Sequence, residues 1–331
     1  MKHKRTLHSG FLATLSCLLL WSLFPGRLAA QTFVIHNLMP DFWRFWAAAE
    51  GKPIEEQARL WQQLYVSPHQ AIFNDLAGPC KDEFDPTWAR TSYFPALPKI
   101  VPQMRAMTDN LPQKLTAAQN RFLKMFPDMS WAGDIYVMAS GYCFNGRAQM
   151  IQGRSAVLFG LDATVALGQK DMVPGMTHEL FHRYHHGFFD FEPSSGYPLW
   201  TTLWAEGLAQ YVSEVLNPGA SDADLAHVPA GMKQGVDTHR QELAADFLKR
   251  FDSTTKADAD LYFNNIRSKD PLVPARGGYE LGVLVVAELA KHYPIQTLAH
   301  WSRSEAMPHI REALMTMAAQ PQPSPGPSQT N

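Results

Sequence analysis

The most constraining feature of this sequence is the spacing of His178 and His182, which stand four residues apart with Glu179 beside the first. On an α-helix, positions i and i+4 lie one turn apart on the same face, so both imidazoles can reach a single ion. Zinc binds neutral histidine nitrogens and keeps one coordination position open in catalytic sites. A glutamate beside the first histidine can then take a proton from the bound water. The spacing therefore predicts a helix over about 174–186 that binds Zn2+ through His178 and His182, with Glu179 as general base.

The composition is that of a globular protein with a large hydrophobic core. The chain has 331 residues, of which 46% are hydrophobic and 18% are charged, which suits one large domain or two smaller ones. Its formal net charge of -2 gives no basic field that would attract nucleic acid. We therefore expect no nucleic-acid partner, and the oligomeric state stays open.

The first thirty residues have the pattern of a secretory signal peptide. A basic start at Lys2 and Arg5 precedes an apolar run over 11–24, and small residues follow up to Ala30. The apolar run is shorter than the roughly 20 residues that a membrane span needs, although an uncleaved N-terminal anchor is the alternative. No other long apolar run follows, so we expect no membrane span in the mature chain. The pattern predicts export to the periplasm or the medium after cleavage near Ala30.

Cys80 and Cys143 are the cysteines that remain once the predicted signal peptide is removed. Exported proteins enter oxidising compartments in which such a pair can form a disulfide. The alternative is two unrelated buried thiols, because proximity cannot be deduced from sequence. We favour the disulfide.

Hydrophobic periodicity predicts an α+β fold that is mainly α-helical. Short strands are expected over 135–138 and 155–161, with a turn at Asn145-Gly146 between them, and residues 71–102 are expected to be irregular. Helices are expected over 111–126, 174–186, 200–216, 239–251, 257–267, 279–292 and 304–318. We thus predict one domain over 31–319, with a β-containing part at about 130–165, zinc helices at about 174–216 and a helical C-terminal part at about 239–319. The tail 320–331, rich in Pro, Gln, Ser and Gly, is expected to be disordered.

A catalytic zinc site needs a third protein ligand, for which Glu206 is the best candidate. It lies on the amphipathic helix predicted over 200–216, and Gly207 beside it would let another backbone come close. The alternative is a solvated surface glutamate. His185 and His186 lie about one helical turn beyond His182, so we expect them at the rim of the site or at the surface rather than on the metal.

The run HELFH followed by LWAEGLAQYV resembles the gluzincin metallopeptidases, in which the second helix supplies a glutamate ligand. The Trp, Glu and Tyr of this second run are close to the pattern of the aminopeptidase branch. The segments DFWRFWAAAE and GGYELG also resemble an uncharacterised family of bacterial predicted zinc-dependent proteases, and the specific motifs cover residues 174–290. The resemblance implies a zincin-like fold, with a small β-sheet before the zinc helix and a helical C-terminal part. It also implies Zn2+ held by His178, His182 and Glu206, and a peptide or protein substrate.

Several departures from that pattern narrow the resemblance. The segment 183–205 is longer than its usual counterpart in gluzincins, and Gln210 stands where the thermolysin branch has an aspartate that orients a zinc histidine. No Gly-x-Met-x-Asn strand is present, so aminopeptidase specificity does not follow. The metzincin pattern requires a glycine where this chain has His185 and a histidine where it has Phe188.

Tyr279 is the candidate for stabilising the oxyanion that hydrolysis produces. Gluzincin aminopeptidases carry a Tyr-x-x-Gly run whose tyrosine donates to the oxyanion, and Tyr279 and Gly282 match its spacing. The alternative is a core tyrosine that opens an apolar helix. The strand over 156–161 can be an edge that binds an extended peptide, as in gluzincins, or a core strand, which we favour slightly.

These observations predict an exported zinc-dependent metallohydrolase, with a peptidase as the favoured activity. In this hypothesis Glu179 is the general base and Tyr279 supports the oxyanion. The alternatives are a zinc-binding scaffold without turnover, a purely structural zinc site, and a hydrolase of a non-peptide amide or ester. The sequence does not decide the substrate or the choice between endopeptidase and exopeptidase.

Overall fold

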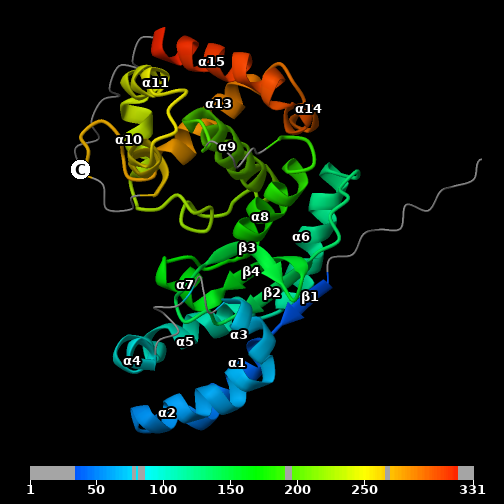
Figure 1. Ribbon diagram of the computed structural model, residues 1–331, viewed down its shortest axis with the longest axis vertical. Coiled ribbons are helices and arrows are strands. Elements are labelled where there is room, and N and C mark those ends of the chain that lie inside the picture. Colours follow the sequence, from blue (N-terminus) through cyan, green and yellow to red (C-terminus); the bar gives the residue numbers. More distant parts are fainter. Residues whose placement is uncertain (1–33, 77–79, 81–85, 191–195, 265–268, 320–331) are drawn as a thin grey trace, which may run out of the picture. The chain divides into compact units, whose positions relative to one another are not determined.

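The computed structural model describes residues 34–76, 80, 86–190, 196–264 and 269–319. The predicted signal peptide, residues 1–30, and the predicted tail, residues 320–331, lie outside the described residues. Within the described part, the chain is mainly helical and contains one small mixed sheet, which confirms an α+β fold (Figure 1). No helix of this part is long and apolar enough to cross a membrane.

The sheet has four strands in the order β1-β2-β4-β3. The strands are β1 (Val34–Asn37), β2 (Asp134–Met138), β3 (Gly146–Ile151) and β4 (Arg154–Gly160). Strands β1, β2 and β4 are parallel, whereas β3 pairs antiparallel with β4 through a tight turn at Gln152 and Gly153, both of which have positive φ. The predicted strands correspond to β2 and β4. β1 and β3 were not predicted.

The expectation that residues 71–102 are irregular is wrong. The segment contains the end of α3 (Gln70–Leu76), α4 (Pro86–Trp88), the π-helix η3 (Ala89–Tyr93) and the start of α5 (Phe94–Thr108). Pro98 and Pro102 lie inside α5 on its exposed side, while Leu97 and Val101 are buried. Burial of the apolar face thus offsets the backbone hydrogen bonds that the prolines remove.

The helices before strand β2 include several that share an aromatic cluster around Trp61. In chain order, the helices before β2 are α1 (Met39–Ala49), α2 (Ile54–Trp61), the π-helix η1 (Gln62–Val66), the short η2 (Ser67–His69), α3, α4, η3, α5 and α6 (Leu111–Met125). Phe42, Phe45 and Tyr65 are fully buried, and their rings pack around Trp61 at centroid distances of 4.6–6.3 Å.

Cys80, after α3, forms a disulfide with Cys143, with a Cα–Cα distance of 5.6 Å. The predicted disulfide is therefore confirmed.

The helices after the sheet are α7 (Leu161–Ala166), α8 (Val173–His185), α9 (Leu199–Leu216), α10 (Met232–Thr238), α11 (Arg240–Lys249), α12 (Lys256–Ala259), the π-helix η5 (Asp260–Asn264), α13 (Gly277–Leu289), α14 (Ile295–His300) and α15 (Arg303–Ala319). Among them, α8, α9, α11, α13 and α15 agree with the predicted ranges to within a few residues, whereas α7, α10 and α14 were not predicted. The helix predicted over 257–267 is instead the short α12 followed by η5.

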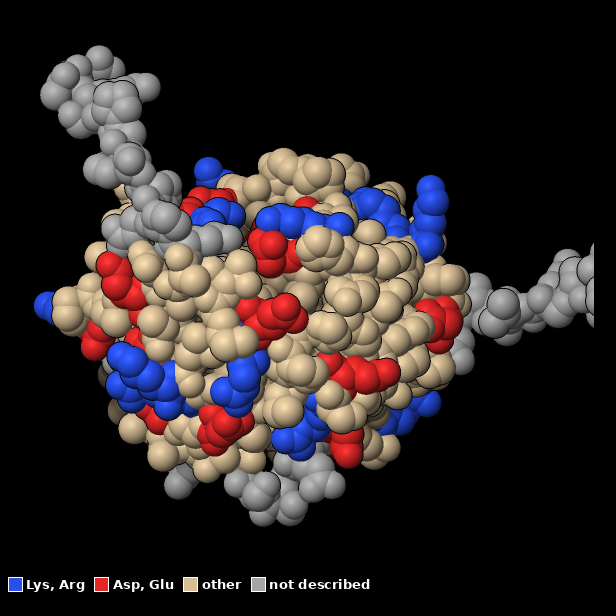
Figure 2. All heavy atoms as spheres, turned by 90° about the horizontal axis from the view of Figure 1, so that it is seen from above, with Lys and Arg blue, Asp and Glu red and all other residues tan. Residues whose placement is uncertain are grey.

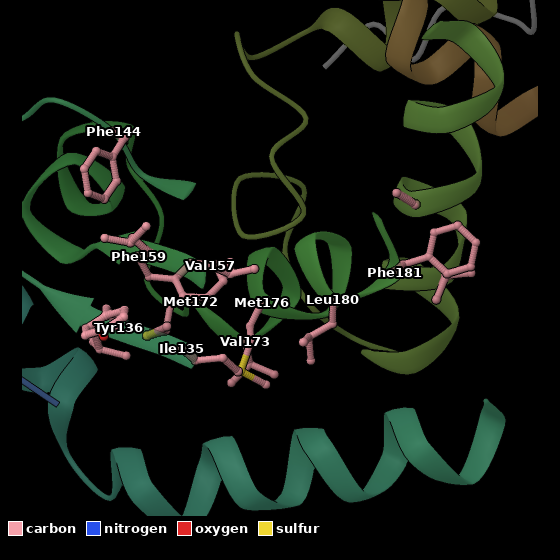
Figure 3. Close-up of a cluster of buried hydrophobic side chains, with 14 of the residues drawn as sticks. Ile135, Tyr136, Phe144, Val157, Phe159, Met172, Val173, Met176, Leu180 and Phe181 are labelled. Atoms are coloured by element: carbon pink, nitrogen blue, oxygen red, sulfur yellow. The ribbon is translucent and has the colours of Figure 1, made fainter. Parts of the chain in front are cut away.

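Helix α8 lies between the sheet and the C-terminal helices (Figure 1). Its apolar residues Val173, Met176 and Leu180 point into a buried cluster with Ile135 and Val157 of the sheet (Figure 3). Because this face is buried, the face that carries His178 and His182 is turned away from the sheet core.

Helices α9 and α13 cross with their backbones in contact. A Cβ atom added to Gly207 would lie 2.5 Å from the Cα atom of Gly282, and one added to Gly282 would lie 2.7 Å from the Cα atom of Gly207. Real Cβ atoms do not come this close to backbone, so both positions require glycine.

On the face shown in Figure 2, basic and acidic side chains are interspersed, as expected at a net charge of -2.

Candidate metal centre

The structure brings the three predicted metal donors, His178, His182 and Glu206, to one point. The Nε2 atoms of His178 and His182 are 3.0 Å apart, and Oε2 of Glu206 lies 3.2 Å from the first and 3.5 Å from the second. In a tetrahedral zinc site with donors about 2.0–2.1 Å from the ion, two donors stand about 3.3 Å apart. The donor set of two imidazoles and one carboxylate, and its spacing, therefore fit Zn2+.

The electrostatics of this cluster keep Glu206 ionised. Burial alone would raise the pKa of Glu206, but the neighbouring His182 and His178 hold it well below its usual range. Burial lowers the pKa of His182, but the charge of Glu206 outweighs this effect, so the pKa of His182 is raised overall. The carboxylate of Glu206 is thus negatively charged and faces both imidazoles. This arrangement suits a divalent cation.

Hydrogen bonds between α8 and α9 set the position of Glu206 relative to the two histidines. Ser213 Oγ donates to the carbonyl of Pro174 at 2.8 Å, and Thr177 Oγ1 donates to Ser213 Oγ at 3.3 Å. Asn217 Nδ2 completes the set by donating to Thr177 Oγ1 at 2.8 Å. Thr177 and Ser213 are buried, so these bonds hold the two helices together next to the donors. We did not predict them from the sequence, because their pairing depends on how α8 and α9 pack.

Glu179 lies against the start of the edge strand β3. A Cβ atom added to Gly146 would lie 3.1 Å from Oε1 of Glu179, so the carboxylate faces bare backbone at this position. Gly146 and Asn145 line the same cavity as the metal donors. The prediction of a turn at Asn145-Gly146 is wrong, because Gly146 begins strand β3 and passes beside the candidate base.

A buried carboxylate holds the loop that leads to Gly146. Asp162 is fully buried and accepts hydrogen bonds from the backbone N–H of Ser140 at 2.8 Å and of Tyr142 at 3.1 Å, as well as from Ser140 Oγ at 3.0 Å. The disulfide to Cys143 lies in the same loop. These bonds leave the loop little freedom to move Gly146 away from Glu179.

Tyr279 lies in the cavity that contains the metal donors. Burial raises the pKa of its phenol well above the usual value, and the charges of Glu206 and Glu179 raise it further. The hydroxyl is therefore protonated at neutral pH and can donate a hydrogen bond. The guanidinium of Arg276 stacks over the ring, 4.3 Å from its centroid. The structure thus places Tyr279 at the wall of the cavity.

The cavity around the donors has a volume of about 430 Å³. Besides the donors, Glu179 and Tyr279, its wall includes Arg183 and Arg276, with apolar surface from Phe159 and Met172. A cavity of this size with several convergent polar groups is typical of a site for a small molecule or a short segment of chain.

His185 differs from the expectation that it lies at the rim or the surface. It is fully buried, with ring centroids 5.4 Å from Phe181 and 5.0 Å from Phe189, and burial lowers its pKa well below the usual value. The expectation was wrong because the apolar residues beside it on α8 turn this part of the helix into the core. His186, by contrast, lines the cavity, as expected of a residue at the rim.

Two further predictions concern Gln210 and the strand over 156–161. Gln210 Nε2 donates to the carbonyl of Leu225 at 2.6 Å and lies 3.2 Å from His227 Nε2, so it orients the segment after α9, and its hydrogen bonds among the described residues do not include His178 or His182. Strand β4, which contains residues 156–161 except the last, is paired on both sides, by β2 and β3. The core interpretation of this strand is therefore correct, and the edges of the described sheet are β1 and β3.

The sequence did not reveal a buried charged cluster that joins α9 to α13. Glu214 Oε1 lies 3.0 Å from Nε2 of His227, and Glu280 Oε2 lies 3.3 Å from Nδ1 of the same ring. The two carboxylates thus face opposite nitrogens, as around a protonated imidazole, whereas the donors of the metal centre face one point. His227 lies in a loop without periodicity, so no local pattern indicates its partners.

No protein-family model, curated protein or solved structure matches this chain. The resemblance to gluzincins therefore stays an expectation from the sequence motifs.

Proposed function

We propose that this protein is a zinc-dependent hydrolase, with peptide bonds as the favoured substrate. The observation that carries the proposal is the triangle of His178 Nε2, His182 Nε2 and Glu206 Oε2, with sides of 3.0–3.5 Å, beside the carboxylate of Glu179. Three protein donors next to a free carboxylate favour an open catalytic centre over a closed structural site, which would use four protein ligands.

The reaction can be derived from the residues around the donors. Zinc, when bound, supplies Lewis-acid chemistry, in that it makes water more acidic and polarises a carbonyl. Glu179 accepts a proton from the attacking water and delivers it to the nitrogen of the leaving group. The protonated hydroxyl of Tyr279 donates to the carbonyl oxygen as negative charge develops on it.

The edge of the sheet supports a peptide as the substrate. Among the described strands, β3 pairs only with β4, and its residues Gly146 and Ala148 line the cavity. An extended peptide that pairs with such an edge would run past Glu179. A zincin-like fold belongs to the same proposal and is supported by the order of sheet, α8 and α9 along the chain.

Export of the protein is also part of the proposal. The N-terminal pattern of charged and apolar residues supports it, and the Cys80–Cys143 disulfide fits an oxidising compartment.

Profiling with a mixed peptide library tests the function. Zinc-loaded wild-type protein is compared with Glu179→Gln by mass spectrometry, and the zinc content of both is measured. We expect cleavage by the wild type alone with zinc in both proteins. Equal cleavage by both would rule out Glu179 as the base. Zinc in both without any cleavage would favour a non-peptide amide or ester, or a zinc-binding scaffold, over a peptidase.

A further inference from the structure

Within the part of the chain that the structure describes, four charged side chains line the cavity of the metal centre: Glu179, Glu206, Arg183 and Arg276. Glu206 faces the two imidazoles, so its charge is directed at the metal donors. The remaining wall carries one carboxylate and two guanidinium groups, a sum of +2 and -1, or +1. His186 adds no charge at pH 7, because partial burial and the nearby Arg183 lower its pKa to about 4.

Arg183 has no acidic partner among the described residues. It follows Glu179 by four positions on α8, a spacing that often produces an ion pair, yet no N–O distance within 4.0 Å joins the two side chains. Its Nε atom is buried without a hydrogen-bond partner. A buried donor left without an acceptor is costly, so the guanidinium is poised for an acceptor that enters the cavity.

Arg276 lines the same cavity and lies just before the start of α13. Its backbone has the left-handed φ of 59°, and its guanidinium stacks on the ring of Tyr279. No carboxylate among the described residues forms an ion pair with it. Stacking occupies the face of the guanidinium and leaves its N–H edge for a planar anion.

We propose that this cavity recognises a carboxylate of the substrate, with Arg183 as the main contact and Arg276 as the second positive charge. The inference rests on the proposed function in taking the anion to be part of the molecule that is hydrolysed. The carboxylate can be the free C-terminus of a peptide or the side chain of an acidic residue near the scissile bond. Both present the same planar anion to a guanidinium.

Binding measurements on zinc-loaded Glu179→Gln protein test the inference without turnover. Calorimetry compares an N-acetylated tripeptide with a free C-terminus, the same peptide as its C-terminal amide, and amidated tripeptides with central Asp or Asn. We expect at least one acid to bind about tenfold or more tightly than its neutral counterpart, since hydrogen bonds to charged groups contribute most. A difference between the free C-terminus and its amide would identify the C-terminal carboxylate as the group that binds. A difference between Asp and Asn would identify an acidic side chain.

Variants of the two arginines complete the test. Arg183→Met in the same background is expected to abolish the preference for the acid, and Arg183→Lys to keep part of it. Arg276→Met should reduce it. The control is Arg44→Met, because Arg44 is exposed and pairs with Asp41 on α1. Thermal unfolding of each variant establishes that it is folded.

The inference is overturned if acids and neutral peptides bind equally, if no peptide binds, or if folded Arg183→Met keeps the full preference. A preference for the acid in a protein whose wild type cleaves none of these peptides would overturn the proposed peptidase function and leave the carboxylate site intact.

Discussion

Nδ1 of His227 lies 3.3 Å from the carboxylate of Glu280, the residue that follows Tyr279 on α13. The other ring nitrogen faces Glu214, two turns beyond Glu206 on α9. Burial lowers the pKa of His227, but the hydrogen bond to Glu214 and the nearby carboxylate of Glu280 outweigh this effect and raise the pKa to about 9. The protonated ring thus bridges the helix that carries a metal donor and the helix that carries the candidate oxyanion donor.

This bridge predicts a stability that depends on pH. The pKa of His227 is raised above its unfolded value of about 6.5, so its contribution is fully present below pH 6.5 and is lost as the pH rises through about 9. His227→Gln should therefore lower the free energy of unfolding by roughly 3 kcal/mol at pH 6 and by less at pH 10. Urea denaturation at both pH values measures this.

The matched control is His292→Gln, since His292 is exposed after α13. It should change the free energy of unfolding little at either pH. An equal loss for His227→Gln at pH 6 and pH 10 would show that the ring acts through packing and not through its charge.

The contact between Gly207 and Gly282 predicts that Gly207→Ala separates α9 from α13. Its Cβ atom would fall 2.4 Å from the carbonyl carbon of Gly282, and backbone cannot move aside cheaply. We expect a loss of about 1–3 kcal/mol in the free energy of unfolding and a lower kcat/KM, because Glu206 and Tyr279 would move apart. Thermal unfolding and peptide cleavage measure the two effects.

Gly175→Ala provides the comparison. Gly175 lies in α8 with no atom within 4 Å of an added Cβ, so alanine should raise the helix stability by up to about 1 kcal/mol. Gly207→Ala is thus expected to lower the free energy of unfolding, and Gly175→Ala to raise it. A loss of the same size in both would refute the steric explanation for Gly207.

Gly146→Ala is expected to disturb Glu179 without affecting the metal. The new Cβ atom would stand 3.1 Å from Oε1 of Glu179, which must then shift by a few tenths of an ångström. We expect kcat to fall roughly tenfold, since small displacements of a catalytic group are costly. The zinc content, measured by atomic absorption, should not change. Loss of zinc would mean that the strand supports the donors instead of the base.

Glu206→Gln is expected to weaken Zn2+ binding, because it removes the anionic donor and leaves two imidazoles. Ligand binding to the folded state raises its stability, so zinc should raise the Tm of the metal-free wild type. The increase should be much smaller for Glu206→Gln at the same zinc concentration. An unchanged increase would place the third ligand elsewhere. This measurement does not depend on any substrate.

The sequence allowed the helices of the site to be predicted because their signals are local. The four-residue spacing of His178 and His182 requires a helix, and the apolar stripe of α9 gave its bounds to within one residue. That Glu206 meets the histidines followed from a family resemblance, since periodicity alone also fits a surface glutamate. The disulfide followed from the small number of cysteines together with the predicted export.

The features that were missed depend on tertiary packing. The prolines of α5 masked a helix that exists because its opposite face is buried. The edge strand β3 contains Arg147 and Gln149, and its partner β4 supplies most of the apolar signal. His227 is buried by neighbours distant in sequence, which leave no local signature, whereas the burial of His185 follows from the apolar residues beside it on α8.

The disulfide between Cys80 and Cys143 has a consequence for any attempt to reduce this protein to a smaller unit. Among the described residues, those that line the cavity lie at or after position 145, so a fragment starting at β2 would contain the three donors, the candidate base and both arginines. It would nevertheless lack Cys80 and the hydroxyl of Tyr65, which accepts from the backbone N–H of Ala139 at 2.7 Å. The loop before Gly146 would lose two of its anchors. The N-terminal helices are thus part of the scaffold that the chemistry requires, and truncation should abolish activity while preserving every residue that performs it.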